Sequence, residues 1–153
     1  MTPTKTLDFT RDLPLDPDRL WPVLTEPEHR ETWGAPEEGM VLTMENADTR
    51  EGGRERHRCG PAEAPDFLVE TRWYRLAAPD LAVFTETLFV GDDRIFTSLV
   101  TYSVTPEGTG SRLQVAVAVS SFTGPEAFDE IEQGWMGGLA NLDALVERLM
   151  SDA

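Results

Sequence analysis

The chain has 153 residues, of which 40% are hydrophobic, and this length suits one domain with a single core. Its 13 Lys and Arg residues against 28 Asp and Glu residues give a formal net charge of −15 at pH 7, which excludes nucleic acid and anionic lipid surfaces as favourable partners. No apolar run approaches the roughly 20 residues of a transmembrane helix, and the N-terminus lacks the basic start and apolar stretch of a secretory signal, so we predict a cytoplasmic protein without membrane insertion.

The N-terminal part of the chain predicts one strand followed by two short helices. Apolar and polar residues alternate from Thr6 to Thr10, which is typical of a strand. Asp16 is a suitable N-cap residue, with Pro17 at the first helical position behind it. Pro27 ends this helix and opens a second one from Glu28 to Trp33, because proline interrupts a helix but is tolerated at its start.

From Gly39 to Ser121 the hydrophobic period changes to two, which predicts six strands in series. Turn signals such as Gly60-Pro61 and Gly91-Asp92-Asp93 separate them. Each connection is too short for a crossover helix, so the strands form an antiparallel meander. With the N-terminal strand, the predicted sheet has seven strands.

The C-terminal segment from Gly124 to Ala153 predicts one long amphipathic helix. Apolar residues recur along it at spacings of three and four and form one stripe. Near its middle three glycines flank Trp135, although each interior glycine costs about 1 kcal/mol relative to alanine. These glycines are Gly134, Gly137 and Gly138. Two explanations are open: another backbone packs closely here, or the missing side chains leave room for a guest molecule beside the tryptophan.

Together these elements predict an α+β protein. A seven-stranded curved antiparallel sheet wraps around the long C-terminal helix, and two short helices follow the first strand. The terminal helix is the only predicted element long enough to cover the apolar face of the sheet. The whole chain, residues 1–153, is expected to form this single domain.

Alternation also predicts which side chains point towards the terminal helix. In the second strand of the series, three arginines alternate with Glu55, His57 and a cysteine. Because three cations on one face can hardly all be buried, this pattern turns the other three residues inwards. The strands that follow direct Thr71, Trp73 and Tyr102 inwards by the same alternation.

The strand from Leu81 to Val90 mixes polar and apolar residues on both faces, which leaves the orientation of Glu86 open. Acidic residues are seldom buried without a partner, so a solvated pair of Glu86 with Arg75 is the preferred interpretation. An inward orientation would place a carboxyl group among the interior polar atoms.

No motif for metal binding or covalent chemistry stands out. The single cysteine, Cys59, excludes an internal disulfide and does not support a thiolate metal site. Glu26, Glu28 and His29 lack the spacing of a zinc-binding HExxH motif, and two histidines cannot form a three-histidine site. We therefore predict neither a metal nor a cofactor.

Several short segments of the chain resemble one known family. They are Arg11–Trp33 (RDLPLDPDRLWPVLTEPEHRETW), Gly52–Arg54, Pro79–Thr85, Leu99–Pro106, Ser111–Leu113, Gln133–Trp135 and Leu142–Leu145. Together they are similar to the family related to the C-terminal domain of the heat-shock-protein-90 ATPase activator, in the START-like (SRPBCC, birch-pollen-allergen-like) superfamily with its helix-grip fold. The resemblance covers nearly the whole chain. Two positions depart from the family pattern: Gly34 stands where a second tryptophan is frequent, and Glu86 stands where an aromatic residue is common.

The resemblance implies a hollow between sheet and helix that in many relatives holds an apolar or amphipathic small molecule. A mostly apolar pocket with a few polar groups is the usual design for such ligands. The candidate cavity residues are Trp33, His57, Trp73, Glu86, Tyr102, Trp135 and Gly138. Core packing alone is an alternative for the tryptophans, since each buries roughly 150 to 250 Å². For His57 three roles are open: a core residue with satisfied hydrogen bonds, a hydrogen-bond partner of a ligand, and a proton carrier.

Three functions follow from this interpretation. The first is binding of a small hydrophobic or amphipathic ligand in the cavity. The second, by analogy with superfamily members that act on small aromatic substrates, is a cyclase or hydrolase-like enzyme with His57 or Glu86 as general acid or base. The third, implied by the family name, is an interaction module that stimulates a chaperone ATPase, for which the acidic surface could steer a basic partner. A homodimer through the sheet edge is also open.

Overall fold

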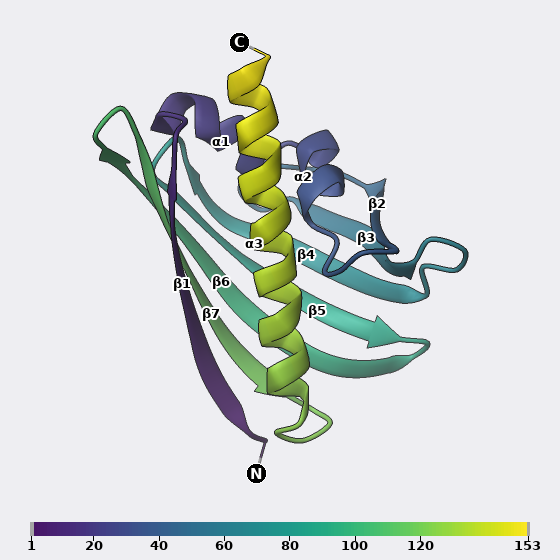
Figure 1. Ribbon diagram of the computed structural model, residues 1–153. Helices are drawn as coiled ribbons and strands as arrows, with labels where there is room; N and C mark the ends of the chain where they lie inside the picture. The colour runs from purple at the N-terminus through teal and green to yellow at the C-terminus, as the bar shows by residue number, and fades with distance from the viewer. Residues whose placement is uncertain (1, 153) are drawn as a thin grey trace.

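In the computed structural model, which describes residues 2–152, one antiparallel sheet curves around a long helix (Figure 1). The strands lie in the order β1-β7-β6-β5-β4-β3-β2 across the sheet. Along the chain the elements are β1 (Thr4–Leu13), α1 (Pro17–Thr25), α2 (Pro27–Trp33), β2 (Met40–Asn46), β3 (Arg54–Pro61), β4 (Phe67–Ala77), β5 (Leu81–Val90), β6 (Asp93–Glu107), β7 (Gly110–Ser121) and α3 (Ala127–Ser151). The predicted seven-stranded α+β architecture, with two short helices after the first strand, is confirmed.

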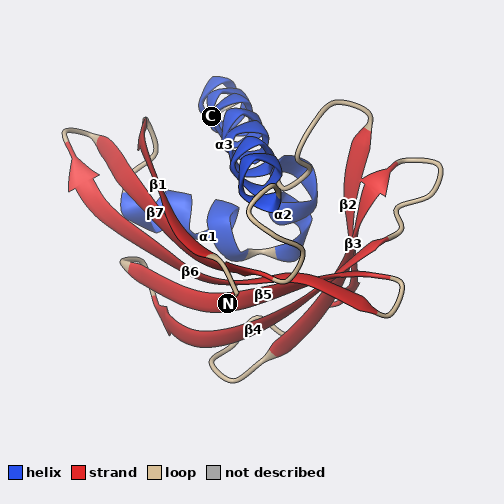
Figure 2. Cartoon of the chain, turned by 90° about the horizontal axis from the view of Figure 1, so that it is seen from below, coloured by secondary structure: helices blue, strands red, loops and turns tan. Residues whose placement is uncertain are grey.

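The elements form a curved wall with a helix inside it. The sheet is the wall, and α3 lies along its concave side (Figure 2). The short helices α1 and α2 lie at one end of the concave side, beside the C-terminal half of α3 (Figure 1). The first strand, β1, pairs with the last one, β7, and Leu7 lies opposite Val117. The first and last strands of the chain are therefore neighbours at one edge of the sheet.

Local signals account for where the helices begin. The Asp16 carboxylate caps α1 by accepting a hydrogen bond from the Arg19 backbone N–H at 2.9 Å. The second helix includes Pro27 and so begins one residue before the predicted Glu28. The third begins at Ala127 rather than at Gly124, because Gly124 has a φ of +103°, which lies outside the helical region. None of the helices formed by residues 2–152 combines the length and apolar character that a membrane span requires.

The hydrophobic core lies between the concave face and the apolar stripe of α3. Every second residue along β7 faces inwards, and these residues are all buried: Leu113, Val115, Val117 and Val119. They meet a buried set from the helix that includes Leu139, Leu142 and Val146. The period of two on the strands and the period near 3.6 on the helix therefore meet in a single core.

The glycines of α3 serve a close approach of two backbones. A Cβ atom on Gly137 would lie 1.8 Å from the carbonyl oxygen of Pro36, in the segment that follows α2. A Cβ on Gly138 would face the Trp33 carbonyl oxygen at 3.5 Å. One turn further on, Asn141 Nδ2 donates to the Ala35 carbonyl oxygen at 2.9 Å. Of the two explanations for the glycines, the structure supports close packing of another backbone.

Candidate functional site

Four polar residues from four adjacent strands lie side by side on the concave face. Strand register places Thr71 opposite both Glu55 and Glu86, and Glu86 opposite Ser98. Residues directly opposite in antiparallel strands share one face of the sheet. We call Glu55 (β3), Thr71 (β4), Glu86 (β5) and Ser98 (β6) the polar row. It lies next to a row that contains Trp73 and Phe84.

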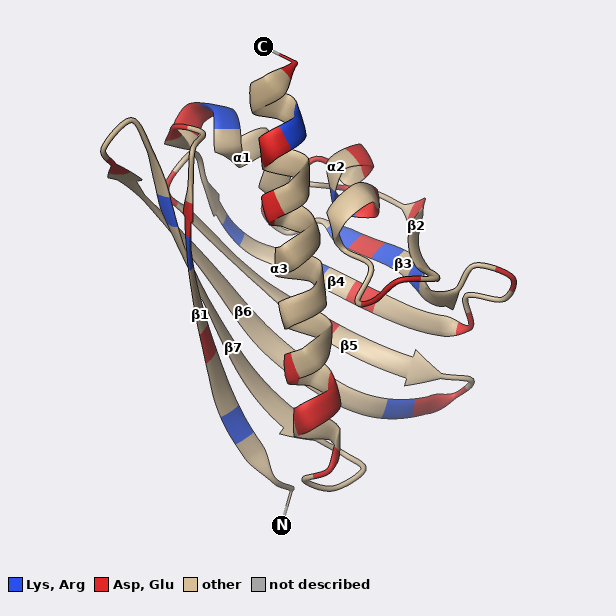
Figure 3. Ribbon diagram, in the orientation of Figure 1, with Lys and Arg blue, Asp and Glu red and all other residues tan. Residues whose placement is uncertain are grey.

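Glu55 ends the polar row with a complete set of partners. Its Oε1 accepts a hydrogen bond from Arg30 Nη2 at 2.8 Å, and Oε2 accepts from the Asp48 backbone N–H at 2.9 Å and the Thr49 hydroxyl at 2.6 Å. The exposed fraction of the side chain is 0% for Glu55 and 11% for Arg30. Burial raises the pKa of Glu55, but the charge of Arg30 and the hydrogen bonds more than offset this, so the pKa is lowered. Glu55 is therefore an ionised anchor for α2. Figure 3 shows acidic and basic residues alternating on β3 at this point.

Glu86 is the other carboxyl of the polar row, and it makes no ion pair with any residue between 2 and 152. It faces inwards like its neighbours Thr71 and Ser98, although part of it is accessible to solvent. Burial raises the pKa of Glu86 to about 7, and the charge of Arg30 only partly counters this. Near neutral pH the carboxyl therefore exists in both protonation states.

The preferred interpretation of Glu86 as part of a solvated pair with Arg75 is wrong. Arg75 is exposed and lies opposite Val83, and a register shift between Trp73 and Arg75 separates it from the polar row. The pleat of β5 instead turns Glu86 to the same side as buried Phe84.

Three further polar atoms of this region are buried without a hydrogen-bond partner among residues 2–152. They are Thr71 Oγ1, Ser98 Oγ and His57 Nδ1, and the exposed fractions of these residues are 3%, 1% and 5%. Leaving such a group unsatisfied costs about 1–3 kcal/mol, and native proteins seldom do so. Burial, followed by the charge of Arg30, lowers the pKa of His57 to about 4, while the charge of Glu55 acts in the opposite direction. At neutral pH its imidazole is uncharged and offers one donor and one acceptor.

Trp73 Nε1 is a fourth buried atom with no hydrogen-bond partner in the described part of the chain. This indole N–H faces the Glu55 carboxylate and helps to lower its pKa, but it lacks the geometry of a hydrogen bond. The guanidinium of Arg30 lies 5.3 Å from the centroid of the Trp73 ring. Trp73 therefore belongs to the anchor formed by Arg30 and Glu55.

A series of aromatic rings connects the sheet beside the polar row with α3. The ring centroids are 4.7 Å apart for Trp73 and Phe84, 5.2 Å for Phe84 and Tyr102, and 6.4 Å for Tyr102 and Trp135. The last two contacts are edge-to-face. Burial raises the pKa of Tyr102, and the charge of Glu86 raises it further, so Tyr102 also lies within reach of the Glu86 charge.

Five of the seven candidate cavity residues lie on the concave face or contact a ring there. Trp73, Tyr102 and Trp135 belong to the aromatic series, and Glu86 belongs to the polar row beside it. His57 lies on the other side of the polar row, opposite Val69. The other two lie in the packing of the helices. Trp33 Nε1 donates to the Val23 carbonyl oxygen of α1 at 2.9 Å, and Gly138 lies against the backbone of Trp33.

Two hollows on the surface lie outside the polar row. The larger has a volume of about 410 Å³ and is lined by Trp21, Thr25, Thr49, Arg50, Glu51 and Leu76. The other, of about 400 Å³, lies over β1 and β7. Neither is lined by a member of the polar row. Thr49 of the larger hollow donates a hydrogen bond to Glu55, so that hollow adjoins one end of the row.

A comparison with known protein families shows which family the chain belongs to. The sequence model of the family described as activator of Hsp90 ATPase homolog 1-like protein (AHSA1) matches residues 14–147. The chain belongs to this family. The AHSA1 match includes the whole polar row and the aromatic residues from Trp73 to Trp135, and it confirms the resemblance found in the short sequence segments.

Solved structures share the same fold. A protein of Rhizobium loti is 24% identical, with a TM-score of 0.81 and coverage of 94% of this chain and 98% of that chain. An uncharacterised protein of Rhizobium leguminosarum is 22% identical, with a TM-score of 0.82 and coverage of 97% of both chains. The AHSA1 protein of Silicibacter pomeroyi is 20% identical, with a TM-score of 0.75 and coverage of 94% and 98%. At these identities the likeness shows the fold alone. No curated protein matches the chain.

Sequence reasoning missed part of this candidate site. Alternation predicted that Glu55 and Thr71 face inwards but assigned them no role. Ser98 has the same parity as the inward residues Val100 and Tyr102, so the same signal could have identified it. For Arg30 no such signal exists, because its position over β3 depends on how α2 packs against the sheet.

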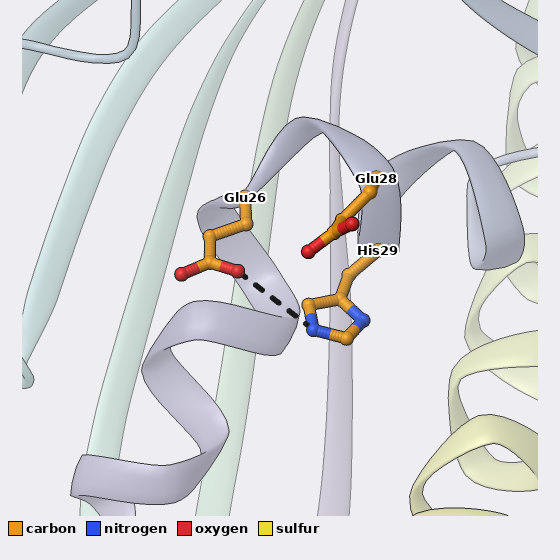
Figure 4. A group of neighbouring side chains, drawn as sticks. All are labelled: Glu26, Glu28 and His29. Carbon is orange, nitrogen blue, oxygen red and sulfur yellow. Dashed lines mark ion pairs between the residues drawn. The ribbon is translucent and has the colours of Figure 1, made fainter.

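The residues rejected as a metal motif nevertheless lie close together. Glu26, Glu28 and His29 hold their possible ligand atoms within 4.8 Å of one another where α1 meets α2 (Figure 4). Glu26 and Glu28 are exposed, and His29 Nε2 lies 3.8 Å from Glu26 Oε2. Such groups of exposed acidic residues are common on protein surfaces. The absence of a bound metal stays a prediction.

Proposed function

We propose that this protein binds a small amphipathic molecule between the concave face of the sheet and α3, with the polar end of the molecule at the polar row. One observation carries this proposal. The hydroxyl groups of Thr71 and Ser98 are buried on either side of Glu86, and none of their hydrogen-bonding capacity is used by the residues that the structure describes. A ligand with polar atoms at this position would supply the missing partners.

The energetic cost of the polar row favours binding over a purely structural role. A core needs only apolar side chains of suitable volume at these positions, and each unsatisfied hydroxyl destabilises the folded state by about 1–3 kcal/mol. A carboxyl group with a raised pKa adds to that cost. Glu55 is the contrasting case, because its oxygens are all engaged by Arg30 and the neighbouring loop. Only the Thr71–Glu86–Ser98 part of the row has unused capacity.

The surroundings suit the apolar part of such a molecule. Phe84, Tyr102 and Trp135 extend from the neighbourhood of the polar row to the helix. Glu86 and Trp135 are both partly accessible to solvent, whereas Thr71 and Ser98 are almost fully buried. An apolar pocket wall with a few convergent polar groups is the common design of small-molecule sites.

Native mass spectrometry tests this function. Protein purified from its own host is expected to carry a reproducible extra mass that disappears on denaturing extraction. A double variant, Thr71→Val with Ser98→Ala, should fold but lose this mass. The matched control is Thr85→Val with Ser103→Ala. It makes the same changes at positions on β5 and β6 whose side chains point to the opposite face of the sheet. Equal retention of the mass by both double variants would contradict a site at the polar row.

A second candidate function is proton transfer by Glu86. Its pKa of about 7 lies where a general acid or base works best, whereas His57, with a pKa of about 4, is unprotonated at neutral pH and cannot act as an acid there. The test is turnover of the extracted ligand by the wild-type protein and by Glu86→Gln. Conversion at the same rate by both would remove Glu86 from any mechanism.

A further inference from the structure

We propose that the molecule bound at the polar row carries a protonated nitrogen, as in an amine on an apolar body, and that this nitrogen pairs with the Glu86 carboxylate. This inference rests on the proposed binding function and names the class of ligand. It follows from the charges, the acceptors and the aromatic rings around Glu86.

The balance of charge in the interior favours a cationic ligand. Five titratable groups from the surrounding elements face the same interior as Glu86: Arg30 (α2), Glu55, His57 and Cys59 (β3), and Tyr102 (β6). Arg30 is the one cation among them, and it is bound by Glu55 at 2.8 Å. Among the described residues, the charge left without a partner in this region is therefore the Glu86 carboxylate. A carboxylate or phosphate ligand would be repelled by it, while a cation would be attracted.

The hydrogen-bonding groups beside Glu86 are those that an amine can use. An ammonium group donates up to three hydrogen bonds and accepts none. A nitrogen paired with the Glu86 carboxylate keeps further N–H donors free. The hydroxyl oxygens of Thr71 and Ser98 are acceptors on both sides, each one strand away, a spacing of about 4.8 Å. An alcohol has a single donor and leaves more of these acceptors unsatisfied.

The aromatic series adds to the preference for a cation. Phe84 precedes Glu86 by two residues on the same face of β5, and it contacts Tyr102, which in turn contacts Trp135. The faces of aromatic rings attract organic cations when water is excluded. An acid beside several aromatic rings therefore favours an organic cation over a neutral molecule of the same shape.

A matched series of three compounds tests the inference. Naphthalen-1-ylmethylamine, naphthalen-1-ylmethanol and 1-naphthoic acid share one apolar body and carry a cationic, a neutral and an anionic group. We expect isothermal titration calorimetry at pH 7.5 to show the amine binding at least about tenfold more tightly than the alcohol, and the acid binding least. Glu86→Gln should reduce the affinity for the amine to that for the alcohol.

Two control variants separate a local effect from a general one. Glu70→Gln removes an exposed carboxylate from β4, one residue from Thr71, and should leave the order of affinities unchanged. Circular dichroism and thermal melting establish whether Glu86→Gln folds; should it not, Ser98→Ala is the substitute and is expected to weaken amine binding selectively. Equal or tighter binding of the alcohol or the acid would overturn the choice of a cation and leave the binding function in place. A failure of all three compounds to bind at millimolar concentration, together with protein from the host that carries no extra mass, would overturn both proposals.

Discussion

Arg30 on α2 and Glu55 on β3 form a buried ion pair, with Arg30 Nη2 2.8 Å from Glu55 Oε1. Because Glu55 also accepts hydrogen bonds from Asp48 and Thr49, this pair joins a helix, a strand and the loop before the strand. It holds α2 over one end of the polar row. Because Arg30 is engaged by Glu55, its charge only partly counters the effect of burial on the pKa of Glu86.

Removing the acid of this pair should destabilise the protein strongly. Glu55→Gln leaves the Arg30 guanidinium buried without its counter-charge, a change that typically costs roughly 3–5 kcal/mol. Urea unfolding followed by circular dichroism measures the change. The matched control is Glu45→Gln, which breaks the exposed pair with Arg58 on the neighbouring strands. A similar loss of stability in both variants would show that burial of the Arg30 pair is unimportant.

The two glycines of α3 nearest Pro36 should respond oppositely to alanine. Gly137→Ala places a Cβ atom 1.8 Å from the Pro36 carbonyl oxygen, so the helix and the loop must move apart. Gly134→Ala brings its Cβ to 3.5 Å from the Pro36 Cβ, an ordinary contact. We expect Gly137→Ala to lower the free energy of unfolding and Gly134→Ala to raise it by up to about 1 kcal/mol through helix propensity. Stabilisation by both substitutions would contradict the close backbone approach.

Thr71→Val should make the unliganded protein more stable and a weaker binder. Valine has nearly the shape of threonine without the hydroxyl that lies buried and unpartnered, so we expect a gain of about 1 kcal/mol in the free energy of unfolding. Thr85→Val, at a position of opposite parity on the next strand, should give no such gain. Thermal melting of both variants gives the comparison. A loss of stability in Thr71→Val would indicate that the hydroxyl is already satisfied.

Glu86 should make the stability of the protein depend on pH. Its pKa in the folded protein, about 7, lies above the ordinary value of 4.5, so the folded state holds the proton more tightly than the unfolded state. This contribution, on the order of 3 kcal/mol, is fully present below about pH 4.5 and is lost as the pH rises through about 7.

A comparison of wild type with Glu86→Gln isolates that contribution. His57, whose folded pKa of about 4 lies below its ordinary value of 6.5, acts in the opposite sense, because its contribution is lost as the pH falls from about 6.5 through about 4. Both proteins retain His57, so the difference between their unfolding free energies reports Glu86. Urea unfolding at half-unit steps from pH 4.5 to 8 should show wild type losing stability relative to the variant. A constant difference would rule out a raised pKa.

Local patterns in the sequence were sufficient to predict the helices and strands, and to predict which side chains of most strands point inwards. Alternation correctly placed Glu55, His57 and Thr71 on the concave face, and the Asp16 cap marked the start of α1. These features depend on neighbours a few residues apart, and the periods of two and 3.6 record them directly. Glu86 was misjudged because both faces of its strand carry polar residues and no local signal distinguishes them.

The sequence alone determined a seven-stranded sheet that curves around a C-terminal helix, since periodicity, capping and turn residues act over short distances. Only the tertiary structure decided that Thr71, Glu86 and Ser98 meet in one row, that Arg30 is engaged by Glu55, and that Gly137 meets Pro36. The physical reason is that strand register and helix packing depend on contacts between residues far apart in the chain, where a shift of a single residue would turn each side chain to the opposite face.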